Sequence, residues 1–274
     1  MGEQQKSGEL RGTVARVVQI VRHLAEGPED WALADLADAL GLPRSTTHRL
    51  LQLLQSQGIV ESDPQSHRYR PGLELYRMAS LLATRMPIVQ MATPLLQEIV
   101  AQCDETALLG LYLPNRRQMI FATKVDSRQP VRYVLEMNVP QSICWGATGR
   151  GILAYLPEAE IEQILSSEES SPTTGEAIDA GEMKRSLAEI RQRGYAFTHG
   201  QRIPGAVGIA VPFFGTHDQV IGDLCLTIPE FRFHADSEGE LVELLSSQAS
   251  RLSQTLGSSR RSNHNRYDLN AKKR

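Results

Sequence analysis

The segment GLPRSTTHRLLQLLQSQGIV, residues 41–60, combines an apolar helical face with a polar face that carries no acid. At about 100° per residue, one side of a helix collects Thr47, Leu50, Leu51 and Leu54. The opposite side collects Ser45, Arg49 and Gln52, flanked by Thr46 and His48, so it carries short hydroxyls, a histidine, an arginine and a glutamine. Such groups suit base edges and phosphates in the major groove of DNA, where phosphates would repel Asp and Glu. The segment therefore predicts a DNA-reading helix; the alternative is a packing helix with a polar outer face.

A second group of small polar residues suits the binding of a small molecule. The motif GATG, Gly146 to Gly149, precedes an apolar helical run, so a ligand carboxylate can approach backbone N–H groups there. Cys225 and Thr227 are two apart in an apolar strand and share one of its faces, opposite Leu224 and Leu226. A thiol and a hydroxyl can hold a small ligand, although a core cysteine and a strand-forming threonine explain the pattern equally well.

The elements around the reading helix complete a DNA-binding module. Residues 14–24 have helical spacing, and WALADLADAL (31–40) predicts a second short helix that ends at a tight turn. The segment IVESDPQSHRYRPG (59–72) alternates apolar and polar residues around a turn, which predicts a hairpin that carries Arg68 and Arg70. Two helices, a reading helix and a basic hairpin are the parts of a winged helix-turn-helix.

The rest of the chain alternates strands and helices. Strands are predicted for ALLGLYL, QMIFATKV, VRYVLEM, YAFTH, AVGIAVPFF and VIGDLCLTI, and helices over residues 73–85, 88–102, 146–156, 183–194 and 236–256. Strands with helices packed on them form an α/β sensory domain. The predicted organisation is a disordered N-terminus 1–10, a DNA-binding domain 11–72, a linker helix 73–86, a sensory domain 87–257 and a disordered basic tail 258–274.

Composition limits the class of protein. The chain has 274 residues, 41% of them hydrophobic, a net charge of −3 and three cysteines without Cys-x-x-Cys spacing. Those cysteines predict neither a disulfide framework nor a zinc knuckle. Because neither a signal pattern nor a membrane-spanning run is present, we expect a cytoplasmic protein with no membrane partner.

Two other functions compete with DNA reading. Cys144 and His199 could meet as a thiolate pair, or bind a metal together with Cys225. The chain lacks a third group at a recognisable spacing, and it has no His-Glu-x-x-His, Gly-x-Ser-x-Gly or phosphate-binding loop. We therefore expect no catalytic residue, no metal and no cofactor. The other alternative is a protein-interaction module whose third helix packs on a partner, with binding that is insensitive to salt.

The motifs together resemble a known family. GLPRSTTHRLLQLLQSQGIVE and HRYRPG are similar to the DNA-binding module of IclR-type transcriptional regulators. GATGRGILAYLP, IRQRGYAF, GIAVPFF and VIGDLCLTIP are similar, in the same order, to the effector-binding domain of that family. The resemblance covers about residues 11 to 257. It implies an α+β two-domain fold, with an N-terminal winged helix-turn-helix and a C-terminal GAF-like α/β effector-binding domain.

The resemblance also implies partners and site residues. The family binds a double-stranded, pseudo-palindromic operator as a homodimer, often as a dimer of dimers, and senses a small organic acid or an aromatic metabolite. Position by position, the DNA-binding residues are Arg44, Ser45, Thr46, His48 and Arg49, with Gln52 on the same face, and Arg68 and Arg70 in the wing. The effector-binding residues are Trp145, Gly146, Ala147, Thr148, Gly149, Thr198, His199, Gly208, Cys225 and Thr227. Because Cys144-Trp145 replaces a frequent histidine, and Thr198 and Gly208 replace acidic or bulkier residues, the identity of the effector does not carry over.

Overall fold

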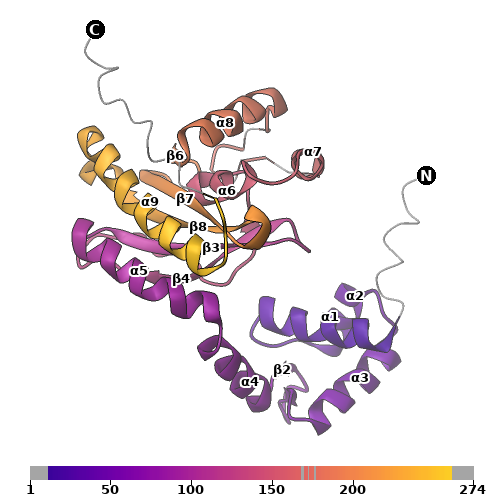
Figure 1. The fold of residues 1–274 in the computed structure, drawn as a ribbon. Coiled ribbons are helices and arrows are strands. Elements are labelled where there is room, and N and C mark those ends of the chain that lie inside the picture. The colour runs from indigo at the N-terminus through magenta and orange to yellow at the C-terminus, as the bar shows by residue number, and fades with distance from the viewer. Residues whose placement is uncertain (1–11, 168–169, 172, 176, 261–274) are drawn as a thin grey trace. The chain divides into compact units, whose positions relative to one another are not determined.

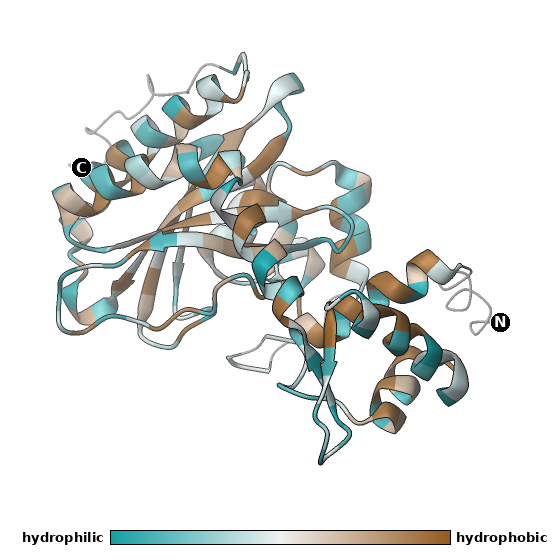
Figure 2. Ribbon diagram, turned by 90° about the horizontal axis from the view of Figure 1, so that it is seen from below, coloured by the Kyte–Doolittle hydropathy of each residue, from teal (hydrophilic) through white to brown (hydrophobic). Residues whose placement is uncertain are grey.

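The chain folds into two units, each with its own core (Figure 1). The computed structural model describes residues 12–167, 170–171, 173–175 and 177–260, and the units divide between Met86 and Pro87. Helices in both units alternate hydrophobic and hydrophilic residues along their length, as elements with one buried face do (Figure 2). The predicted disordered N-terminus, residues 1–10, and residues 261–274 of the predicted disordered tail 258–274 lie outside the described residues.

The N-terminal unit is the predicted winged helix-turn-helix. Its elements are α1 (Thr13–Glu26), α2 (Leu33–Leu40), α3 (Arg44–Ser56), β1 (Val60–Ser62), β2 (Tyr69–Pro71) and α4 (Leu73–Thr84). Gly41 ends α2 with a left-handed φ of 62°, a conformation that glycine adopts without a steric penalty. Pro43 then precedes the first turn of α3, where a missing backbone donor costs nothing. The core is formed by Ile20, Leu24, Leu36, Leu40, Leu50, Leu51, Leu54, Val60 and Tyr69.

The C-terminal unit is one antiparallel sheet with helices on both faces. The strand order is β5-β4-β3-β8-β7-β6. The strands are β3 (Thr106–Leu113), β4 (Gln118–Val125), β5 (Gln141–Ser142), β6 (Ala196–His199), β7 (Ala206–Phe214) and β8 (Val220–Pro229). The helices are α5 (Pro87–Cys103), α6 (Gly146–Leu153), α7 (Glu158–Ser167), α8 (Ala180–Arg193) and α9 (Glu238–Thr255). Short 3-10 turns cover Thr216–Asp218, Glu230–Arg232 and Ala235–Ser237.

The two faces of the sheet have different chemistry. Helices α5 and α9 lie side by side on one face, where they pack on Leu224 and Leu226 of β8 (Figure 1). Helix α6 packs on the other face, which carries Asp223, Cys225 and Thr227 of the same strand. This alternation follows from the two-residue period of a strand, and it confirms that Cys225 and Thr227 share a face opposite the leucines.

Three features differ from the sequence prediction. VRYVLEM is not a strand, because residues 131–137 form a loop in which Val131 and Val134 are exposed, 55% and 94% respectively. Helix α7 was not predicted, although Ile161 and Ile164 have the spacing of a buried helical face. The predicted disordered tail is wrong at its start, because Ser258, Ser259 and Arg260 fold back and hydrogen bond to the carboxylate of Asp218.

No helix in the described ranges is long and apolar enough to cross a membrane.

Candidate DNA interface and ligand cavities

Helix α3 exposes the polar face that the sequence predicted. Thr47, Leu50 and Leu51 are fully buried against the core of the module. The outer face is polar and contains the exposed residues Arg44, Ser45, His48, Arg49 and Gln52, with Thr46 half-buried. Because the helix contains no acid, its outer surface is free of the charges that phosphates repel.

The wing holds its two arginines in ion pairs. Arg68 donates from Nε to Asp30 Oδ1 at 2.5 Å and from a terminal nitrogen to the Asp30 backbone oxygen at 3.3 Å. Arg70 lies 3.4 Å from Glu61, whose other oxygen accepts from the backbone N–H of Leu73. Both pairs are at least partly exposed, so the arginines can exchange these partners for phosphates at a small energetic cost.

The turn of the wing is held by one carboxylate. Asp63 accepts from the backbone N–H groups of Gln65 and Ser66 at 2.8 and 2.7 Å. These hydrogen bonds hold the pKa of Asp63 below its usual value. The turn is therefore tied by a charge-assisted cap that is complete at neutral pH.

A small cavity lies between α6 and strands β6, β7 and β8, and we call it the first cavity. Its volume is about 40 Å³. Seven of the predicted effector-binding residues line it: Gly146, Ala147, Thr148, Thr198, Gly208, Cys225 and Thr227. Phe121, Leu135 and Ile203 add an apolar part to the wall. The structure thus brings together residues that lie up to 106 positions apart in the chain, from Phe121 to Thr227.

Arg202 spans one side of the first cavity. Its guanidinium donates to the side-chain oxygen of Gln141 at 2.5 Å and to the backbone oxygens of Ser142 and Trp145 at 2.5 and 2.7 Å. These bonds tie the loop after β6 to the loop before α6, and Arg202 itself lines the cavity. Sequence reasoning missed Arg202 and its neighbour Gln201, since a basic residue in a polar loop carries no signal by spacing alone.

A buried carboxyl lies behind the first cavity. Asp223 is fully buried, and Gly110 and Gly151 leave the space for it, because a Cβ at either would lie 2.4 or 3.2 Å from its oxygens. Among the described residues, neither oxygen of Asp223 nor the hydroxyl of Thr148 has a hydrogen-bond partner. Burial raises the pKa of Asp223 well above its usual value, against opposing effects of Thr148 and the Arg202 charge. Burial likewise raises the pKa of the Cys225 thiol to about 12.

Three predicted effector-binding residues are not in the first cavity. Trp145 and His199 line a separate second cavity of about 440 Å³. The His199 ring packs on Phe197, and its Nδ1 lies 3.7 Å from Glu230. Gly149 lies under the backbone of Ile143, where a Cβ would be 2.6 Å from the Ile143 oxygen. Trp145, His199 and Gly149 therefore lie outside the lining of the first cavity, and their predicted role in effector binding stays a prediction.

The described residues do not assemble the alternative chemistry. Cys144 is fully buried, whereas His199 is exposed beside Phe197 and Glu230. No group of three or more His, Cys, Asp or Glu side chains that could hold a metal occurs within the parts of the chain that the structure describes.

Comparison with known proteins identifies the family. The IclR helix-turn-helix domain model matches residues 13–64, and the model of the bacterial transcriptional regulator IclR C-terminal domain matches residues 80–254. The chain belongs to the IclR family. IclR proteins of this kind are DNA-binding transcriptional regulators and not enzymes, and this chain is one of them.

Individual members of the IclR family are similar to this chain over most of their length. The chain is 27% identical to the HTH-type transcriptional regulator KdgR of Dickeya chrysanthemi over 246 residues, which cover 89% of this chain and 80% of KdgR. It is also 27% identical to the glycerol operon regulatory protein of Streptomyces griseus over 250 residues, 90% of this chain and 97% of that protein. The crystal structure of an IclR transcriptional regulator from Alicyclobacillus acidocaldarius matches with a TM-score of 0.77 and 26% identity, covering 89% and 98% of the two chains. The two-domain α+β fold is therefore that of the IclR family.

Proposed function

We propose that this IclR regulator reads its operator with the outer face of α3 and the wing, and that a small organic acid or aromatic metabolite controls it from the first cavity. The observation that carries the DNA part is the exposed, acid-free face of α3, on which Arg44 and Arg49 stand among short hydroxyl side chains. Helices that lie in the major groove use such side chains to contact base edges and phosphates.

The lining of the first cavity supports an effector with a carboxylate and a compact apolar body. Thr148, Thr198 and Thr227 offer hydroxyls, and Arg202 offers a cationic group that can accept a carboxylate as a partner. Phe121 and Leu135 offer apolar surface for the rest of the molecule. With about 40 Å³, however, the cavity has room only for a few waters, each of which needs about 10–15 Å³.

The small volume implies that the first cavity opens when an effector enters. The hydrogen bonds of Arg202 close the loops around it, so an effector that takes Arg202 as a partner changes how these loops are tied. A ligand shifts a conformational equilibrium only as far as it binds the two states unequally. The effector therefore acts by favouring the open arrangement, which alters operator affinity.

We also propose that the working unit is at least a homodimer. Helix α4 exposes long apolar side chains along its length, including Leu73, Tyr76, Leu81 and Leu82. Val14 and Val18 of α1 are exposed as well. A second copy of the chain that covers these side chains would remove them from water, and two copies would read two operator half-sites about one helical turn, roughly 34 Å, apart.

Fluorescence anisotropy tests the DNA part directly. Labelled duplexes that tile the DNA around the gene are titrated with protein at two salt concentrations. We expect one fragment to bind far more tightly than the others, with an affinity that falls steeply with salt because phosphate contacts release counterions. Folded protein that binds every fragment equally, or with no salt dependence, would favour the interaction-module alternative.

The same titration tests the effector part. The preferred duplex is titrated in the presence of small acids and aromatics, and 4-hydroxybenzoate, which occupies an IclR homologue of Microbacterium hydrocarbonoxydans, is a convenient first probe. An active compound should change operator affinity in the unaltered protein and lose its effect when Gly208→Val fills the first cavity, where a Cβ already meets Ala147 at 3.0 Å. An effect that survives this substitution places the effector elsewhere.

A further inference from the structure

The second cavity is a separate space in the sensory domain. It has a volume of about 440 Å³ and lies between Trp145, Arg150 of α6 and residues of α8 that include Met183 and Ser186. Among the described residues, its lining shares only Gln201 with the first cavity. Its size matches that of small-molecule sites, which commonly occupy 300–1,000 Å³.

Arg150 brings a cation into this cavity, and among the described residues no acidic side chain forms an ion pair with it. Its Nε donates to the backbone oxygen of Cys144 at 3.1 Å, and the described part of the chain offers its two terminal nitrogens no hydrogen bond. The side chain is half-buried, and burial lowers the pKa of its guanidinium. Since a buried charge is costly unless it is paired, a guanidinium in this position favours an anion beside it.

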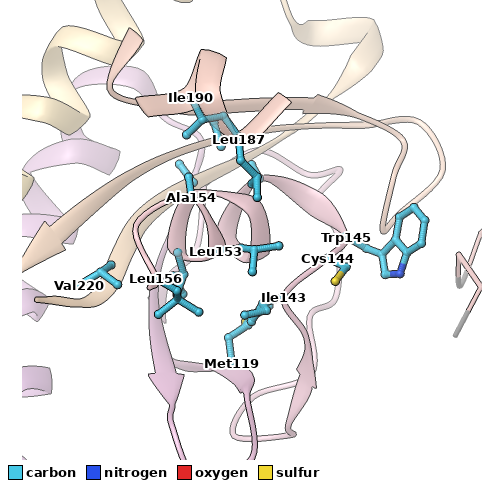
Figure 3. Close-up of a cluster of buried hydrophobic side chains, with 14 of the residues drawn as sticks. Met119, Ile143, Cys144, Trp145, Leu153, Ala154, Leu156, Leu187, Ile190 and Val220 are labelled. Atoms are coloured by element: carbon cyan, nitrogen blue, oxygen red, sulfur yellow. The ribbon is translucent and has the colours of Figure 1, made fainter. Parts of the chain in front are cut away.

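Two more polar atoms of the lining have no hydrogen-bond partner among the described residues. Trp145 is 8% exposed, and its indole Nε1, which can only donate, is buried with no acceptor among the described residues. The side-chain oxygen of Gln201 is also buried and unpaired within the same ranges. Figure 3 shows the indole of Trp145 turned away from Ile143, Leu153 and Met119 of the core cluster. Buried polar atoms in proteins nearly always have a partner, so a small molecule in this cavity could supply hydrogen-bond partners to these two atoms.

We propose that the second cavity binds a small organic monocarboxylate, with Arg150 and the Trp145 N–H as donors to its carboxylate. A planar guanidinium holds a carboxylate through paired hydrogen bonds. Asp179 and Glu182 also line the cavity and repel a second negative charge, which selects a monoanion. Ile178 and Met183 provide contact for an apolar body. This site is separate from the proposed effector site in the first cavity, and it can be tested independently of that site.

The natural tryptophans make the proposal measurable. The chain has two, Trp31 and Trp145, and Trp31 lies in the DNA-binding module, where its Nε1 donates to His23. In the Trp31→Phe variant of the full chain, emission reports on Trp145 alone. We expect benzoate to produce a saturable change in emission and a matching calorimetric isotherm with a Kd of about 1 mM or tighter. Neutral benzamide should give no response, and the dianion phthalate should bind at least about tenfold more weakly.

Variants assign the response to the second cavity. In the Trp31→Phe background, Arg150→Gln should weaken benzoate binding by about tenfold or more. Ser186→Phe, which fills the cavity from α8 without changing Arg150, should do the same. Arg191→Gln is the matched control, because Arg191 also donates from Nε to a backbone oxygen, that of Ala154, but does not line the cavity. Gly208→Val should leave this benzoate binding unchanged.

Several results would overturn the proposal. It fails if neither emission nor calorimetry detects saturable benzoate binding up to about 10 mM. It also fails if Ser186→Phe and Arg150→Gln bind as the parent does, or if Gly208→Val abolishes the response while they retain it. Because operator binding is not part of this readout, failure here leaves the proposed DNA and effector functions untouched.

Discussion

The carboxyl group of Asp223 is fully buried, and neither of its oxygens has a hydrogen-bond partner among the described residues. Its raised pKa means that the native protein holds a proton which the unfolded chain releases above about pH 3.9. The native state therefore binds more protons than the unfolded state, and stability falls as pH rises from there towards the native pKa. The loss is about 1.4 kcal/mol for each pH unit in that window.

The Asp223→Asn variant should remove this pH dependence. An amide of nearly the same shape does not ionise, so the variant should lose less stability than the parent between pH 5 and pH 8. The difference in unfolding free energy between variant and parent should therefore shift in favour of the variant towards pH 8. Thermal or urea unfolding at several pH values measures the slope. Asp236→Asn, a change at an exposed site, is the control and should follow the parent. Parallel curves for parent and Asp223→Asn would mean that Asp223 is ionised in the folded protein.

Arg49 stands at the centre of the polar face of α3 and is exposed. Its replacement by alanine should weaken operator binding by about 1–3 kcal/mol if it contacts a base or a phosphate. Loss of a base contact would also relax the sequence preference. Loss of a phosphate contact would weaken binding to all sequences alike and reduce its salt dependence. Anisotropy titrations of Arg49→Ala and of Arg85→Ala, an exposed arginine after α4, separate a local effect from a general loss of charge. Equal affinities for Arg49→Ala and the parent remove Arg49 from the interface.

At the scale of elements, the packing of α6 depends on a glycine. Gly149 of this helix lies so near the preceding loop that a Cβ would be 2.6 Å from the backbone oxygen of Ile143. Backbone cannot give way as a flexible side chain can, so Gly149→Ala should destabilise the sensory domain by about 1–3 kcal/mol. Gly239→Ala is the control, because Gly239 also lies in a helix, α9, and a Cβ there would meet nothing within 4 Å. Equal unfolding midpoints for the two variants would show that the loop relaxes freely.

The elements that the sequence predicted are those with a strong local period. The buried and exposed faces of α3 and the hairpins β1–β2, β3–β4 and β7–β8 follow from residue patterns that need no distant partner. VRYVLEM has the same local pattern, but residues 131–137 take part in none of the strand pairings of the described sheet, so tertiary context overrides their propensity.

Residues of the site were predictable only in part for a related reason. In β6, Thr198 lines the first cavity while its neighbour His199 packs on Phe197. Neighbouring side chains along a strand point to opposite faces of the sheet. Which of them faces the cavity depends on the strand register, which is set by the whole sheet. The sequence did not predict Arg202, because it lies in a polar loop. It did not predict Asp223 either, because a charged residue is not expected inside a buried strand.

At the scale of the whole molecule, the net charge of −3 hides an uneven distribution. Four arginines face only Glu61 and Asp63 between residues 44 and 70, so the DNA-binding segment is cationic within an acidic chain. Each unit also has its own hydrophobic core. Because each unit has a core of its own, DNA binding and effector sensing can be assigned to separately folded units.

Residues 87–260 should consequently fold and sense without the N-terminal unit. We expect this fragment to unfold cooperatively, to bind the effector with an affinity close to that of the full chain, and to show no salt-dependent preference for the operator. Calorimetry and anisotropy on the fragment and the full chain measure these quantities side by side. Retained operator preference in the fragment would move the DNA interface out of α3 and the wing.

If the effector binds in the first cavity as proposed, the tied loops around that cavity also limit how fast the regulator can respond. With Arg202 holding three oxygens and only about 40 Å³ of space inside, an effector must wait until the loops part. The observed binding rate then rises with effector concentration only to a plateau, which equals the opening rate of the loops. Pulses of metabolite shorter than the opening time would then leave transcription unchanged. The hydrogen bonds of Arg202 would thus set the shortest response time of the regulator.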